Sequence, residues 1–113
     1  MTLPHPLPDD IVELIARRFR VIGEPMRIRL LDHLRADEAS VNELAEALGA
    51  SQQNVSKHLA VLAEVGIVGR RKVGNHVYYR IIDEGVFALC DQVCGSVQEQ
   101  LRVLNKLVEG VST

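Results

Sequence analysis

Residues 40–66, SVNELAEALGASQQNVSKHLAVLAEVG, constrain the fold of this chain more than any other stretch. Ser40 and Glu43 have the Ser-x-x-Glu spacing of a capping box, in which each side chain bonds the other residue's backbone N–H. Gly49 is placed to end that first helix, because glycine adopts the left-handed conformation common at helix ends. Ser51 can cap a second helix immediately afterwards. The segment therefore predicts two short helices joined by a tight turn.

The hydrophobic periodicity changes after this helix pair. Residues 67–82 contain two short runs rich in β-branched and aromatic residues, separated by Gly74-Asn75, a pair suited to a two-residue hairpin turn. One alternating set of side chains should face the body of the domain: Val73, Val77, Tyr79 and Ile81. Two helices, a tight turn and a hairpin in this order predict a winged helix-turn-helix, a mostly α fold with a small β-hairpin.

A long apolar seam occupies the last part of the chain. From Asp83 to Val108, apolar residues recur at spacings of three and four, as in a coiled coil. A helix of about 25 residues is nearly 40 Å long, which one small domain can hardly cover. The seam therefore implies a partner, most economically an identical subunit packed about a two-fold axis. The interface residues expected on this last helix are Val86, Cys90, Val93, Val97, Leu101 and Leu104.

The net charge of −2 conceals an uneven distribution. Residues 51–81 contain five basic residues against the single acid Glu64, a net charge of +4, and the segments on either side each carry −3. Because a phosphate backbone responds to local positive potential, this basic segment favours a nucleic-acid partner. The alternative is a solvated, charged hairpin.

Length and composition indicate one domain at residues 10–109, preceded by a flexible arm at residues 1–9. No apolar run approaches the roughly 18 residues of a membrane-spanning helix, and the N-terminus does not resemble a secretory signal. Two cysteines are too few for a disulfide scaffold. We therefore expect a cytoplasmic protein without a membrane partner.

Three stretches together resemble the ArsR/SmtB family of bacterial transcription regulators: GEPMRIRLLDHL at 23–34, the helix pair at 40–68, and GRRKVGNHVYYRI at 69–81. The resemblance runs from about Ile15 to Leu101. It implies a homodimer built on the first helix (residues 9–22) and the last, which adds Ile15 and Phe19 to the expected interface. It also implies a repressor that leaves its promoter when an inducer, often a metal ion, binds. A winged helix that binds another protein is the alternative. An enzyme is not expected, because no nucleophile–base pair or phosphate-binding glycine loop has a useful spacing.

On this interpretation the second helix of the pair enters the major groove of double-stranded operator DNA by its N-terminal end. Glutamine can pair with adenine, lysine with guanine or phosphate, and serine with either kind of group. For His58 two roles stay open, a phosphate contact or a link between two helices. The candidate DNA-binding residues are Ser51, Gln52, Gln53, Ser56, Lys57, His58, Arg70, Arg71, Lys72, Asn75 and His76.

Two metal sites common in the resembled family are not predicted for this chain. The first needs a Cys-Val-Cys stretch where this sequence has Ser40-Val41-Asn42, and serine and asparagine are poor ligands for soft metals. The second needs two histidines on the last helix, at positions occupied by Gly85 and Ser96. The acids that remain there cannot complete a four-ligand zinc site.

Cys90 and Cys94 are the only cysteines, four positions apart on the expected last helix. They can be small apolar residues of the seam, since free cysteine packs as a small hydrophobe. They can also be an effector site, which binds a soft metal or metalloid ion, forms a disulfide across the two-fold axis, or takes a persulfide or sulfenic acid on an accessible thiol. A disulfide within the helix is disfavoured, because Cβ atoms at this spacing lie about 5–6 Å apart.

Overall fold

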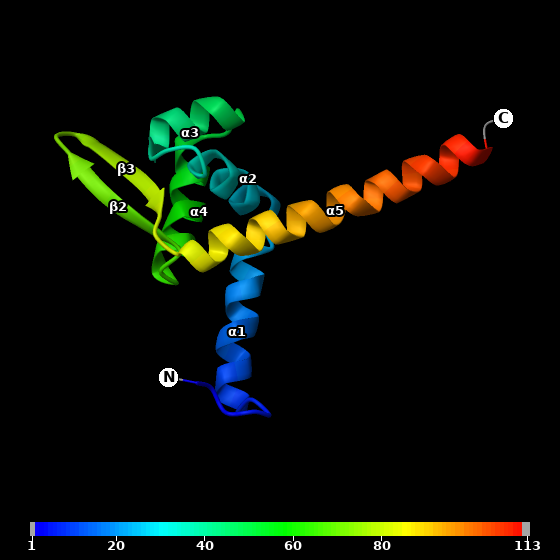
Figure 1. Cartoon of the computed structure of the whole chain (residues 1–113). Helices are drawn as coiled ribbons and strands as arrows, with labels where there is room; N and C mark the ends of the chain where they lie inside the picture. The colour runs from blue at the N-terminus through cyan, green and yellow to red at the C-terminus, as the bar shows by residue number, and fades with distance from the viewer. Residues whose placement is uncertain (1, 112–113) are drawn as a thin grey trace. The chain divides into compact units, whose positions relative to one another are not determined.

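The computed structural model describes residues 2–111, and within them the chain forms five helices and three strands. Figure 1 labels the helices and the two longer strands. The helices are α1 (Asp9–Ile22), α2 (Pro25–Leu34), α3 (Val41–Leu48), α4 (Gln52–Glu64) and α5 (Glu84–Val111). The strands are β1 (Ala39–Ser40), β2 (Val68–Val73) and β3 (His76–Ile81). The chain divides into two compact units, and the division falls between Ile82 and Asp83.

The caps of α3 and α4 form as their sequence predicts. The Ser40 hydroxyl accepts from the backbone N–H of Glu43 at 3.1 Å, and the Glu43 carboxylate accepts from the backbone N–H of Ser40 at 3.2 Å. Gly49 follows α3 with φ of 62°, in the left-handed region. Ser51 then caps α4 by accepting from the backbone N–H of Asn54 at 3.1 Å. The predicted capping box and glycine turn are therefore confirmed, and they place the start of α4 directly after α3.

The core of the first unit lies where α2, α3 and α4 meet the base of the sheet. Each aliphatic side chain buried there contributes about 1.5–3 kcal/mol to stability. The residues at or below 5% exposure in this core are Leu30, Leu31, Leu34, Leu44, Ala45, Val55, Leu59, Leu62, Ile67, Val68 and Tyr79. Because Val55, Leu59 and Leu62 lie on one face of α4, the opposite face of that helix is left in solvent.

The sheet is antiparallel, in the order β1-β3-β2. Val73 pairs with His76 across the Gly74-Asn75 turn, which confirms the predicted hairpin. Val73 itself was expected to face the body of the domain, and this was wrong, because its side chain is 47% exposed. The hairpin extends beyond the core, so burial falls along β2 from Val68 at its base to the exposed turn. The two-residue strand β1, which pairs Ala39 with Tyr79, was not predicted.

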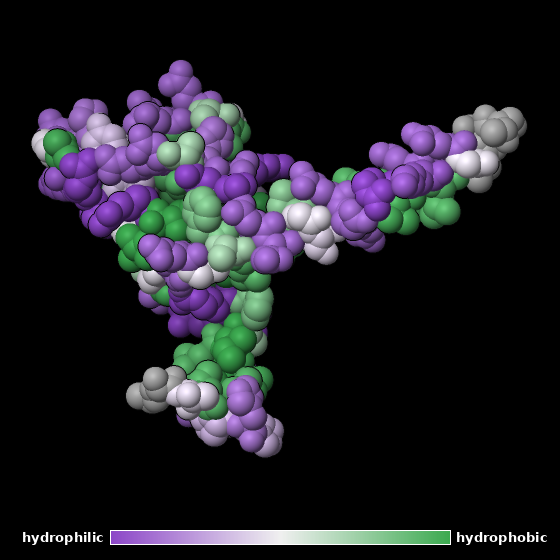
Figure 2. All heavy atoms as spheres, in the orientation of Figure 1, coloured by the Kyte–Doolittle hydropathy of each residue, from purple (hydrophilic) through white to green (hydrophobic). Residues whose placement is uncertain are grey.

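The second unit is the long helix α5. The Asp83 carboxylate caps it by accepting from the backbone N–H groups of Gly85 and Val86, at 2.9 and 3.2 Å. Its apolar seam is buried at Val86, which is 4% exposed, half-buried at Cys90, and open to solvent from Val93 onward. Figure 2 shows apolar surface along one side of the C-terminal half of this helix. The exposed members are Val93, Val97, Leu101, Leu104 and Val108, at 47–66% exposure. Within residues 2–111, no helix is long and apolar enough to cross a membrane.

Candidate nucleic-acid interface

The N-terminal half of α4 presents polar side chains to solvent. Gln52, Gln53, Ser56 and Lys57 are all exposed, whereas Val55 between them is fully buried. This separation follows from the 3.6-residue period, which directs the apolar positions inward and leaves the polar ones on the outer face. The structure thus brings these four predicted residues together on one surface, with donors and acceptors that suit base edges.

The wing, formed by β2, β3 and their turn, carries four basic residues, Arg70, Arg71, Lys72 and Arg80. Arg70 and Lys72, both predicted phosphate contacts, are exposed. Arg71 is also exposed, but its guanidinium forms an ion pair with the carboxylate of Glu38 and lies 5.7 Å from the centre of the Tyr78 ring. Glu38 therefore neutralises part of the charge expected from the wing. Sequence reasoning missed Glu38, because it precedes Arg71 by 33 positions and no local pattern joins them.

His58 lies on the inner side of α4, where it links this helix to α2. Its Nδ1 is 3.2 Å from the guanidinium of Arg27 and 3.6 Å from the carboxylate of Glu24. Only 15% of the side chain is exposed. Arg27 also donates to the backbone carbonyl of Val21, so the three side chains connect the end of α1 to α4. Of the two roles open for His58, these contacts support the link between helices, and a phosphate contact stays a prediction.

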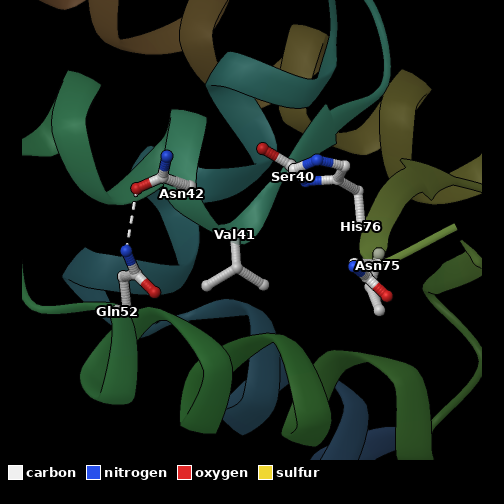
Figure 3. A pocket seen from close by; sticks show the side chains of 7 residues that line it. Ser40, Val41, Asn42, Gln52, Asn75 and His76 are labelled. Atoms are coloured by element: carbon white, nitrogen blue, oxygen red, sulfur yellow. Dashed lines mark hydrogen bonds between the residues drawn. The ribbon is translucent and has the colours of Figure 1, made fainter. Parts of the chain in front are cut away.

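A hollow of about 230 Å³ lies between the start of α3, the start of α4 and the tip of the wing (Figure 3). Asn75 and His76, both predicted DNA contacts, line it from the wing, and Gln52 lines it from α4. On its α3 side, Asn42 accepts a hydrogen bond of 2.8 Å from the Gln52 amide. Asn42 was not among the predicted site residues, since only the close approach of the two helix starts brings it to Gln52.

The two cysteines lie on α5, in the second unit. Cys90 is half-buried, Cys94 is exposed, and neither forms a disulfide. Among the residues that the structure describes, no group of three or more His, Cys, Asp or Glu side chains could hold a metal ion. A soft ion on these thiols would therefore need ligands from a second subunit to exceed two-fold coordination.

Comparisons with known proteins agree with this geometry. A family model described as a helix-turn-helix domain matches residues 22–71. The chain is 42% identical over 83 residues to the HTH-type transcriptional regulator KmtR of Mycobacterium tuberculosis, a match that covers 74% of this chain and 64% of KmtR. It thus spans less than two thirds of the length of KmtR. It is 33% identical over 96 residues to the transcriptional repressor SmtB homolog of Synechocystis, a match that covers 85% of this chain and 73% of that protein.

A solved structure agrees as well. The homodimeric winged helix-turn-helix DNA-binding domain of Mb0332 from Mycobacterium bovis, described as a possible ArsR-family transcriptional regulator, superposes with a TM-score of 0.76. The superposition covers 87% of this chain and 94% of that domain, at 29% sequence identity. Fold, cap pattern and sequence relatives all agree with the resemblance seen in the three sequence stretches. The chain therefore belongs to the ArsR/SmtB family of winged helix-turn-helix transcriptional regulators.

Proposed function

We propose that this chain is a sequence-specific DNA-binding transcriptional repressor that acts as a homodimer. The observation that carries the proposal is the exposed polar face of α4, which lies in the same unit as the basic wing. A helix of this kind fits the major groove, where glutamine, serine and lysine can contact base edges. Arg70 and Lys72 suit the phosphates that flank the groove, and such contacts position the protein without reading sequence.

The exposed apolar rows on α1 and α5 support the homodimer. On α5, Val97 and Leu101 are each about half exposed, and on α1 the side chain of Phe19 is 57% exposed. Apolar side chains repeated along one helix are costly in water, and a second copy of the chain would cover them. A two-fold axis would also present two copies of α4 to successive major grooves, about 34 Å apart.

Binding to promoter DNA tests the proposal. We expect the chain to bind a duplex from upstream of its own gene more tightly than a scrambled duplex of equal composition, measured by fluorescence anisotropy. Lys57→Ala should weaken binding to both, because it removes a cation from the DNA-facing side of α4. The matched control is Lys106→Ala, an exposed lysine on α5 that should leave affinity unchanged. Equal affinity for the promoter and scrambled duplexes would contradict the proposal and favour a protein-binding winged helix.

We further propose that the inducer acts on the thiols of Cys90 and Cys94. Exposure of Cys94 supports access by a reagent, and thiolates are the side chains that soft metal and metalloid ions prefer. Oxidation or persulfidation of an accessible thiol is the other chemistry open to this pair. A homodimer would hold four such thiols, enough ligands for one soft ion shared between subunits.

The thiol proposal is tested by release of DNA from a preformed complex. Arsenite, Hg²⁺ and hydrogen peroxide are titrated separately into complexes of the wild type and of the Cys90→Ser/Cys94→Ser variant. We expect at least one reagent to release the wild type and leave the variant bound. Equal release of both proteins would place the effector elsewhere. If both proteins stay bound to DNA in the presence of all three reagents, the result would instead favour a repressor without a cysteine-based effector.

A further inference from the structure

The amide of Gln52 is held by a neighbour on another helix. Its Nε2 donates to Oδ1 of Asn42 at 2.8 Å, and this bond joins the first turn of α4 to the first turn of α3. Figure 3 shows the nitrogen of Gln52 facing Asn42 and its oxygen turned away from that residue. Both side chains are exposed, so the pair lies on the surface that we assign to DNA.

The direction of this amide decides what it can read. Rotation of a free glutamine amide lets either its oxygen or its nitrogen face a base. When the nitrogen is bound to Asn42, Oε1 and the second N–H are the groups left for the base. The major-groove edge of adenine offers an N6 donor and an N7 acceptor, which match Oε1 and N–H of glutamine respectively. Guanine presents its O6 and thymine its O4 in place of the N6 donor of adenine. Both oxygens are acceptors, so neither can bond Oε1.

We propose that Asn42 is a positioning residue that directs Gln52 toward adenine and so sets the base preference of the protein at one operator position. The inference rests on the proposed DNA-binding function and names a residue that need not touch DNA itself. Binding to DNA would exclude water from the pair, and a hydrogen bond is electrostatically stronger where the local dielectric is low. The contact therefore becomes most effective in the complex, where the base is read.

Gln53 provides an internal comparison. It is also exposed on the first turn of α4, but none of the side-chain hydrogen bonds found in residues 2–111 involves its amide. An effect of Asn42 that depends on Gln52 and not on Gln53 would separate positioning from a general change of the surface. Loss of the Asn42 side chain should not unfold the protein, because the residue is exposed and alanine is a better helix former than asparagine.

The experiment selects sequences from a library of randomised duplexes and measures relative affinities for the four bases at each enriched position. Replacing Asn42 by alanine should reduce the adenine preference at one position about three- to tenfold, the range expected for loss of one hydrogen bond. Asn42→Asp keeps an acceptor toward Gln52 and should preserve that preference, although its negative charge should lower affinity for all sequences. Asn42→Ala should change nothing further in a Gln52→Ala background, but should retain its effect in a Gln53→Ala background.

Several results would overturn the inference. Adenine preference as sharp in Asn42→Ala as in the wild type would show that Gln52 needs no positioning. An equal effect of Asn42→Ala in the Gln52→Ala background would show that Asn42 acts independently. A base preference of the Asn42→Asp variant that switches from adenine to guanine or thymine would show that the Gln52 amide is used in the opposite direction. Enrichment of no sequence by the wild type would refute the proposed function itself, whereas enrichment without adenine at any position refutes only the role of Asn42.

Discussion

Replacing Glu38 by glutamine should strengthen DNA binding. In the structure the Glu38 carboxylate pairs with the guanidinium of Arg71, whose side chain is 56% exposed, and Tyr78 flanks the same guanidinium. Arg71 must give up this pair before it can bind a phosphate. Glutamine keeps the size of the side chain and removes the competing negative charge, so Arg71 becomes available to DNA at a smaller cost.

The magnitude follows from the exposure of the pair. Exposed ion pairs contribute about 0–1 kcal/mol, so the substitution should raise affinity up to about fivefold for each wing and should cost about 1 kcal/mol of folding stability at most. Each additional phosphate contact steepens the plot of log affinity against log salt by about 0.9. A dimer with two released arginines should therefore show a slope steeper by about 2 than the wild type.

The assay is fluorescence anisotropy on a promoter duplex between about 50 and 200 mM salt, a range over which phosphate contacts change affinity strongly. Asp37→Asn is the matched control, because it removes the same charge one residue away and Asp37 bonds the backbone N–H of Glu38 rather than Arg71. We expect the control to change the slope little. A slope for Glu38→Gln equal to that of Asp37→Asn would refute the idea that Glu38 competes with DNA for Arg71.

Three further predictions concern stability, assembly and titration. Gly49→Ala should lower the free energy of unfolding by about 1–2 kcal/mol, because φ at this position is 62°. Gly95→Ala, in the exposed interior of α5, should raise it by about 0.5–1 kcal/mol. Urea unfolding measures both changes. Leu101→Glu should shift a dimer to monomer in sedimentation, since this 55% exposed side chain lies on the proposed seam; an unchanged mass would contradict that seam. The hydrogen bonds from Arg102 hold the pKa of Glu99 below its ordinary value, so their stabilising effect is present above the ordinary pKa and is lost as pH falls through the lowered one. Arg102→Gln should raise that pKa in an NMR titration, and an unchanged pKa would contradict this assignment.

Local features of the fold could be predicted from the sequence because their causes are local. The capping box at Ser40 and Glu43 and the left-handed Gly49 depend on residues within a few positions of each other. The strand β1 could not be predicted in this way, because two residues give no periodicity and the strand exists only through its pairing with β3. The same limit explains why the expectation for Val73 was wrong. How far the tip of the wing extends from the core is not encoded in the alternation of nearby residues.

The candidate site shows the same division. The exposed face of α4 followed from helical periodicity, so the sequence sufficed for residues such as Gln52. The partners that adjust this face come from distant parts of the chain, because Arg27 meets His58 across 31 positions and Glu38 meets Arg71 across 33. Such contacts depend on how helices pack, and only the three-dimensional structure brings them together.

The most direct test of the central proposal is the salt dependence of binding to promoter DNA. A dimer that places Arg70 and Lys72 of both wings on phosphates, while Glu38 holds Arg71, should give a slope of about −3.6 for log affinity against log salt. It should also keep a preference for the promoter duplex over a scrambled duplex at every salt concentration. Affinity that stays constant as salt rises, or that is equal for the two duplexes, would contradict the assignment of this chain as a sequence-specific DNA-binding repressor.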